Sequence, residues 1–129
     1  MILLDTHVWV WLASESPRLD LDIQQHLHAH RAGGLGVSVI SCWEVAKLVE
    51  GGRLVLDQPV ARWIETALAL PGIVTLPLTP AIAVDSTQLP VPFHRDPADQ
   101  LLVATARVLN VPLLTADEKI RAYAHVVTL

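Results

Sequence analysis

Short apolar runs alternate along this chain with longer segments whose apolar residues recur every three to four positions. This alternation is typical of a parallel β-sheet that is covered by helices on both faces. The expected strands span residues 2–4, 35–39, 73–76, 112–115 and 126–129. We therefore predict an α/β fold with a central parallel sheet of about five strands and helices on both of its faces.

The segments between the expected strands carry helix start and stop signals. The strongest is Asp96-Pro97, because aspartate caps a helix and proline fits its first position, and Asn110 would end that helix. The other expected helices span residues 17–31, 41–50 and 59–70, with a short one within 115–123. The two glycines at 51 and 52 supply a stop signal for the second of these.

The chain length bounds the domain organisation and the cellular setting. With 129 residues, of which 52% are hydrophobic, the chain has the size of one domain covering residues 1–129. The first 13 residues are apolar but lack a basic leader and are interrupted by Asp5 and His7, so we expect neither export nor a membrane partner. The expected location is the cytoplasm.

The net charge of -4 excludes one class of nucleic-acid binder, the strongly basic protein that attracts polyanions over its whole surface. A polyanion would have to be held locally, by bound cations and by a few basic side chains near them. The only cysteine, Cys42, has no partner for an internal disulfide.

Four acidic residues fall where a parallel sheet gathers its ligands. Asp5 ends the first expected strand and Asp117 lies just beyond the fourth, and open α/β sheets bind ligands at the carboxyl ends of their strands. Glu44 and Asp99 lie in the first turns of helices that start from the same edge. The sequence therefore predicts four carboxylates in one crevice.

Taken singly, each of these acids has a structural explanation. Ser41 and Glu44 match a capping box, and Asp5, Asp99 and Asp117 suit a helix cap or a first turn. Taken together they need another explanation, because two carboxylates about 4 Å apart repel by roughly 4 kcal/mol at an effective dielectric near 20. A cluster of four would need cations, and ligands that are all oxygen favour Mg²⁺ or Mn²⁺.

Four stretches of the chain carry a family resemblance in the same order and at the same spacings. They are LLDTHVW at 3–9, SVISCWE at 38–44, HRDPADQLLVATA at 94–106 and LTAD at 114–117. On these stretches the chain resembles the PIN-domain ribonucleases, and most closely the VapC toxins of toxin-antitoxin pairs. One departure is Gln100, where many members of that family place arginine.

The resemblance implies a metal-dependent endoribonuclease that hydrolyses RNA phosphodiester bonds. The implied catalytic and metal-binding residues are Asp5, Glu44, Asp99 and Asp117, with Thr6, Asp96 and Thr115 in support and Lys47, His94 and Arg95 as contacts to RNA. Lysine on a helix is more often simply solvated, and the same holds for charges in an exposed loop such as 94–95. The implied partners are RNA, a cognate antitoxin protein and a second copy of the chain in a homodimer.

Two other functions remain open at this point. The first is a catalytically silent domain of the same fold that acts only by binding partners. The second is a receiver-type signalling domain, which needs a phosphoacceptor aspartate at the end of the central strand and a lysine at the end of the last. The expected strands at 73–76 and 126–129 offer neither residue, so this function is disfavoured.

Overall fold

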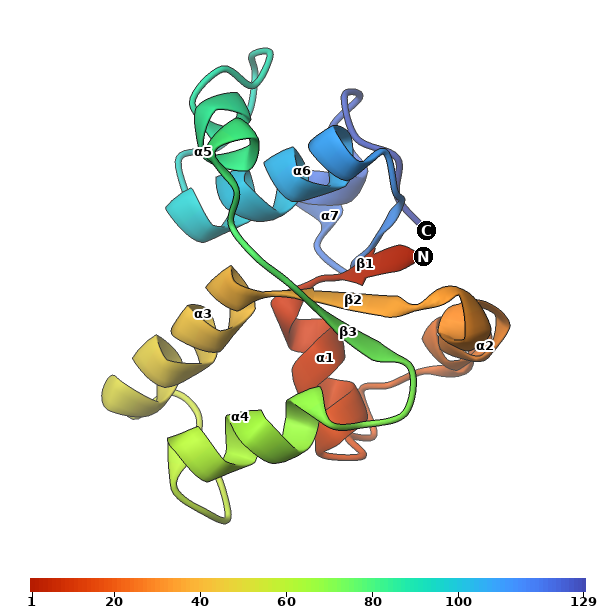
Figure 1. Ribbon diagram of the computed structural model, residues 1–129, viewed down its shortest axis with the longest axis vertical. Coiled ribbons are helices and arrows are strands. Elements are labelled where there is room, and N and C mark those ends of the chain that lie inside the picture. The colour runs from red at the N-terminus through yellow and green to blue at the C-terminus, as the bar shows by residue number, and fades with distance from the viewer.

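A parallel sheet in the order β3-β2-β1-β4 forms the centre of the computed structural model, which describes residues 1–129 (Figure 1). Its strands are β1 (Ile2–Leu4), β2 (Leu35–Ser38), β3 (Ile73–Leu76) and β4 (Leu113–Leu114). One side carries α1 (Thr6–Ala13), α2 (Leu21–His30), α3 (Val39–Glu50) and α4 (Val60–Leu68), and the other side α5 (Pro80–Ser86), α6 (Pro97–Leu109) and α7 (Glu118–Arg121). The predicted α/β fold with helices on both faces is confirmed.

Two hydrophobic clusters fill the spaces between the sheet and its helices. On the first side, Trp9 of α1 is fully buried and its ring meets Trp63 of α4 edge to face, with ring centroids 5.3 Å apart. On the second side, Leu102 of α6 and Ile120 of α7 are fully buried against the sheet. Core packing thus accounts for two of the four tryptophans, whereas Trp43 on α3 is 53% exposed.

The prediction of a fifth strand at residues 126–129 is wrong. Residue 128 makes a single parallel bridge to Leu113, and the last residue pairs by its amide with the carbonyl of Leu113. The reason is the length of β4, which has only two residues and so offers no ladder along which a fifth strand could pair. The sheet therefore has four strands.

Side-chain caps move several helix starts away from their expected positions. Asp20 accepts a hydrogen bond from the amide of Ile23, so α2 begins at Leu21 and not at residue 17. Ser38 caps the amide of Ile40, so α3 begins two residues before Ser41, which therefore is not a capping-box residue. The short helix α5 was not expected, although Thr79 followed by proline is a start signal.

The four strands point their carboxyl ends toward the same edge of the sheet, and helices start there. α1 follows β1 directly after Asp5, and α3 follows β2 directly after Ser38. Asp117, three residues after the end of β4, is the cap of α7. None of the seven helices is both long and apolar enough to cross a membrane.

Candidate active site

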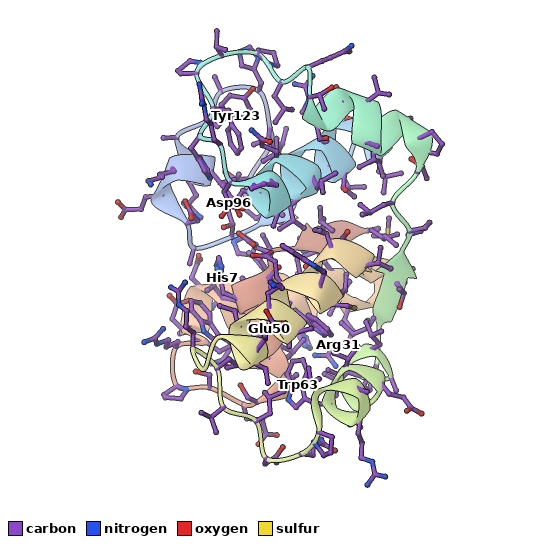
Figure 2. The ribbon with its side chains drawn as sticks, turned by 90° about the vertical axis from the view of Figure 1, so that its left-hand side faces the viewer. His7, Arg31, Glu50, Trp63, Asp96 and Tyr123 are labelled. Carbon is purple, nitrogen blue, oxygen red and sulfur yellow. The ribbon has the colours of Figure 1, made fainter.

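The four predicted carboxylates line one pocket of about 320 Å³ at the carboxyl edge of the sheet. Asp5 is the N-cap of α1, Glu44 lies on α3, Asp99 lies in the first turn of α6 and Asp117 is the N-cap of α7. In Figure 2, the labelled His7, which also lines the pocket, lies at the boundary between the two groups of helices. No three acidic, histidine or cysteine side chains lie close enough together to form a ready-made metal-binding group.

Asp5 is the most buried of these acids, with 3% of its surface exposed. Its Oδ1 accepts a hydrogen bond of 2.7 Å from the amide of Thr6, which begins α1. Its Oδ2 accepts one of 2.6 Å from Oγ1 of Thr115, at the end of β4. Each carboxylate oxygen keeps a second lone pair, so the cap of α1 leaves Asp5 able to bind a cation.

Glu44 is held by the hydroxyl of Thr6, which donates to its Oε1 at 2.5 Å. The same hydroxyl lies 2.7 Å from Oγ of the buried Ser41. Because the single proton of Thr6 goes to the carboxylate, Ser41 must be the donor in the second contact. Ser41 and Glu44, which match a capping box in the sequence, are therefore joined by hydrogen bonds through Thr6, and these bonds fix Glu44 against α1.

Burial raises the pKa of Glu44 to about 7, from an ordinary value of 4.5. The hydrogen bond from Thr6 lowers this pKa, while the charges of Asp5, Asp99 and Asp96 raise it further. Burial also raises the pKa of Asp99, against the hydrogen bond from His94. Desolvation and mutual repulsion of carboxylates thus act at this pocket, and a bound cation would relieve both. The oxygen-only donor set fits Mg²⁺ or Mn²⁺.

This raised pKa predicts a stability that falls with pH in the metal-free protein. Between pH 4.5 and about 7, folded Glu44 holds a proton that the unfolded chain has released. The stabilisation is therefore fully present below pH 4.5 and is lost as the pH rises to about 7. Urea unfolding at pH 5 and pH 7.5 should show a decline in the wild type that Glu44→Gln reduces. Equal declines in the two proteins would contradict the assignment.

Asp99 is held at the start of α6 by two neighbours from the preceding loop. Nε2 of His94 lies 2.6 Å from Oδ2 of Asp99, and the amide of Asp99 donates to Oδ1 of Asp96 at 3.1 Å. Asp96 caps the helix, is exposed and does not line the pocket. The side chain of Gln100 donates to the carbonyl of His94, so the residue that departs from the family pattern helps to hold this loop.

Asp117 is tied to Asp5 through Thr115. The amide of Asp117 donates to Oγ1 of Thr115 at 3.0 Å, and the same hydroxyl donates to Asp5. Oδ1 of Asp117 accepts from the amides of Lys119 and Ile120, which leaves Oδ2 without a protein partner. The expected supporting position of Thr115 therefore corresponds to a buried bridge between two of the four acids.

None of the three predicted RNA contacts lines the pocket. Nζ of Lys47 is 2.6 Å from Oε1 of Glu50 on the exposed side of α3. Arg95 lines a separate hollow together with Phe93 and Gln100. Of the predicted contacts, only His94 touches one of the four acids.

Sequence reasoning missed two polar side chains that line the pocket, His7 and Arg53. His7 stands two residues after Asp5, inside the first matching stretch, and that position was the available signal. Arg53 follows the two glycines that end α3, and no ion pair engages its guanidinium. An arginine in a loop carries no sequence signal that separates it from other exposed charges.

Comparison with known proteins gives matches over nearly the whole chain. Residues 2–126 match the family profile of the PIN domain. The chain is 36% identical over 124 residues to Ribonuclease VapC22 of Mycobacterium tuberculosis, covering 96% of this chain and 92% of that protein.

Solved structures match the fold over the full chain at low sequence identity. VapBC2 from Rickettsia felis, bound to a DNA fragment from its promoter, superposes with a TM-score of 0.74 at 14% identity, covering 100% of this chain and 98% of that chain. A toxin-antitoxin complex from Klebsiella pneumoniae gives 0.66 at 18% identity, with coverage of 100% and 96%.

Proposed function

Since this chain belongs to the PIN domain family, we propose that it is a Mg²⁺- or Mn²⁺-dependent endoribonuclease, the toxin of a toxin-antitoxin pair. The observation that carries the proposal is the meeting of Asp5, Glu44, Asp99 and Asp117 in one pocket, although these residues lie far apart in the sequence. A relative that shares 36% of its residues is itself a ribonuclease by name. RNA phosphodiester hydrolysis is the chemistry that both facts support.

The residues divide the work according to their hydrogen bonds. Asp5, Glu44 and Asp99 would hold the principal cation, and the free Oδ2 of Asp117 would hold a second, weaker cation or an ordered water. When bound, such cations supply an activated water and neutralise charge on the phosphate. Thr6 orients Glu44, Thr115 orients Asp5 and His94 orients Asp99, so the protein's own contribution is to keep the carboxylates in place.

Arg53 is the basic residue that lines the acid pocket, and we include it in the proposal as a phosphate contact. Its guanidinium is free of carboxylate partners, which leaves its donors available to an RNA phosphate beside the scissile bond. Arg95 and Lys47 are retained as outer contacts, where a longer RNA would reach beyond the pocket.

The proposed protein partners are a cognate antitoxin and a second copy of the chain. The matched Klebsiella structure is a toxin-antitoxin complex, and the matched Rickettsia structure contains the pair VapBC2. On this chain, Val39 and Trp43 are exposed apolar side chains four residues apart on α3, a spacing that places them on one face of that helix. Such a face suits a protein partner.

Incubation of the purified protein with single-stranded RNA, with and without Mn²⁺, tests the proposed function. We expect cleavage with Mn²⁺ and none after chelation with EDTA. Mn²⁺ binding without cleavage of any RNA in a diverse pool would identify the catalytically silent domain instead. A gain in mass on treatment with a small phosphodonor would identify the receiver-type domain.

A further inference from the structure

His7 joins two segments of the pocket that are far apart in sequence. It lies in the first turn of α1, two residues after Asp5, and its Nε2 accepts a hydrogen bond of 3.0 Å from the amide of Ala116. Ala116 lies in the loop that links β4 to α7 and directly precedes Asp117. His7 therefore connects the turn that holds Asp5 to the loop that holds Asp117.

This hydrogen bond fixes the chemical state of the ring. A nitrogen that accepts a bond from an amide carries no proton, so the ring proton is on Nδ1. Nδ1 lies 3.7 Å from Oδ2 of Asp5, which makes this contact an N–H that faces a carboxylate and not an ion pair. The ring also packs on Trp11 with centroids 4.8 Å apart. Three neighbours thus hold the ring in one orientation.

The loop at 115–117 has two anchors on the Asp5 side of the pocket. One is the hydroxyl of Thr115, which donates to Asp5, and the other is the amide of Ala116, which donates to His7. The side chain of Asp117 itself contacts only amides of its own helix, so these contacts set its position relative to Asp5. Without His7, the hydroxyl of Thr115 would be the remaining side-chain anchor on the Asp5 side, while Arg121 of α7 holds the carbonyl of Thr115 from the other side of the loop.

We propose that His7 is a positioning residue that holds Asp117 opposite Asp5, so that the second cation site at Asp117 lies beside the cation site of Asp5. The proposal rests on the proposed function for the role of the cations, while the hydrogen bond to Ala116 stands independently of it. His7 acts through the loop, and Asp117 is the group through which its effect reaches the metal.

Two substitutions separate the acceptor from the shape of the ring. His7→Phe keeps the packing on Trp11 and removes the acceptor, whereas His7→Gln places an oxygen near the position of Nε2. In metal-free protein, we expect His7→Phe to raise the hydrogen-exchange rate of the Ala116 amide by on the order of tenfold, and His7→Gln to restore it. Electron paramagnetic resonance titration should show Mn²⁺ binding weakened roughly tenfold in His7→Phe.

A double-mutant cycle tests whether His7 acts through Asp117. Asp117→Asn removes the charge and keeps a residue that caps helices well. In that background, His7→Phe should change Mn²⁺ affinity by less than about twofold, because the group that it positions no longer binds the ion. The matched control is His26→Phe on α2, since the side chain of His26 has the same exposed fraction of 30% as that of His7. It should leave Mn²⁺ affinity and Ala116 exchange unchanged.

Two outcomes would overturn the proposal by itself, and they are distinguishable from failure of the proposed function. Unchanged Ala116 exchange in His7→Phe would remove the anchor itself. An equal loss of Mn²⁺ affinity with and without Asp117 would show that His7 does not act through that residue. Absence of Mn²⁺ binding by the wild type would refute the cation part together with metal dependence. Failure to cleave RNA, with all Mn²⁺ and exchange results as expected, would refute the ribonuclease alone.

Discussion

Replacement of Asp5 by asparagine is expected to lower RNA cleavage by on the order of 1,000-fold. The substitution removes the negative charge of Asp5 from the centre of the site. Asp5 is buried beside Glu44 and is linked by Thr115 to the loop of Asp117. The amide oxygen of asparagine can still accept the bond from the amide of Thr6 and begin α1. Cleavage rates in Mn²⁺, measured beside thermal unfolding, should show lost activity in a folded protein.

The matched control for this change is Asp57→Asn, which neutralises an exposed aspartate in the loop before α4. It should leave cleavage unchanged, since Asp57 does not line the acid pocket. Asp5→Asn should also bring the pKa of Glu44 closer to its ordinary value, because the charge of Asp5 contributes to raising it. Cleavage by Asp5→Asn within a fewfold of the wild-type rate would refute the proposed role of Asp5.

Replacement of Trp9 by alanine is expected to cost about 3–5 kcal/mol of folding free energy. The side chain is fully buried, packs against Trp63, and donates through Nε1 to the carbonyl of Ala67 at 3.2 Å. Its removal leaves a cavity between α1 and α4 and an unpaired carbonyl. Because small domains have a total stability of roughly 5–15 kcal/mol, urea unfolding should show a protein near the limit of folding.

Trp43→Ala is the matched control for the core, because the same side chain is removed from a position that is 53% exposed. The expected change is within about 0.5 kcal/mol, as for other surface substitutions. Similar losses at the two positions would contradict the arrangement in which α1 packs on α4 through Trp9.

Elements with strong local signals were predictable from the sequence. The helix at α6 begins at Pro97 and ends at Leu109, with Asn110 in the left-handed conformation, because its cap residues act locally. The start of α3 was misplaced by two residues, since either Ser38 or Ser41 is a suitable cap and tertiary packing chooses between them. The fifth strand failed because pairing depends on the length of its neighbour β4, which local residues do not encode.

The set of acids was predictable, whereas the contacts that hold them were not. The carboxyl ends of parallel strands lie at one edge of the sheet, so locating the strands was enough to predict that Asp5 and Asp117 lie near each other. The bond between His7 and Ala116 spans 109 positions, and no local pattern encodes such a pair. The pairing of Lys47 with Glu50, three residues further along α3, was likewise not foreseen from the sequence.

Two of the acids in the pocket each perform a second task with a single oxygen atom. Oδ1 of Asp5 and Oδ1 of Asp117 start the helices α1 and α7, whatever the remaining oxygens bind. A descendant protein that had lost all enzymatic turnover would still be under selection to keep aspartate, or a similar capping residue, at both positions. Retention of these two aspartates across a lineage is therefore weak evidence of activity. Glu44 and Asp99 cap no helix, so the loss of either would be the clearer record of lost catalysis.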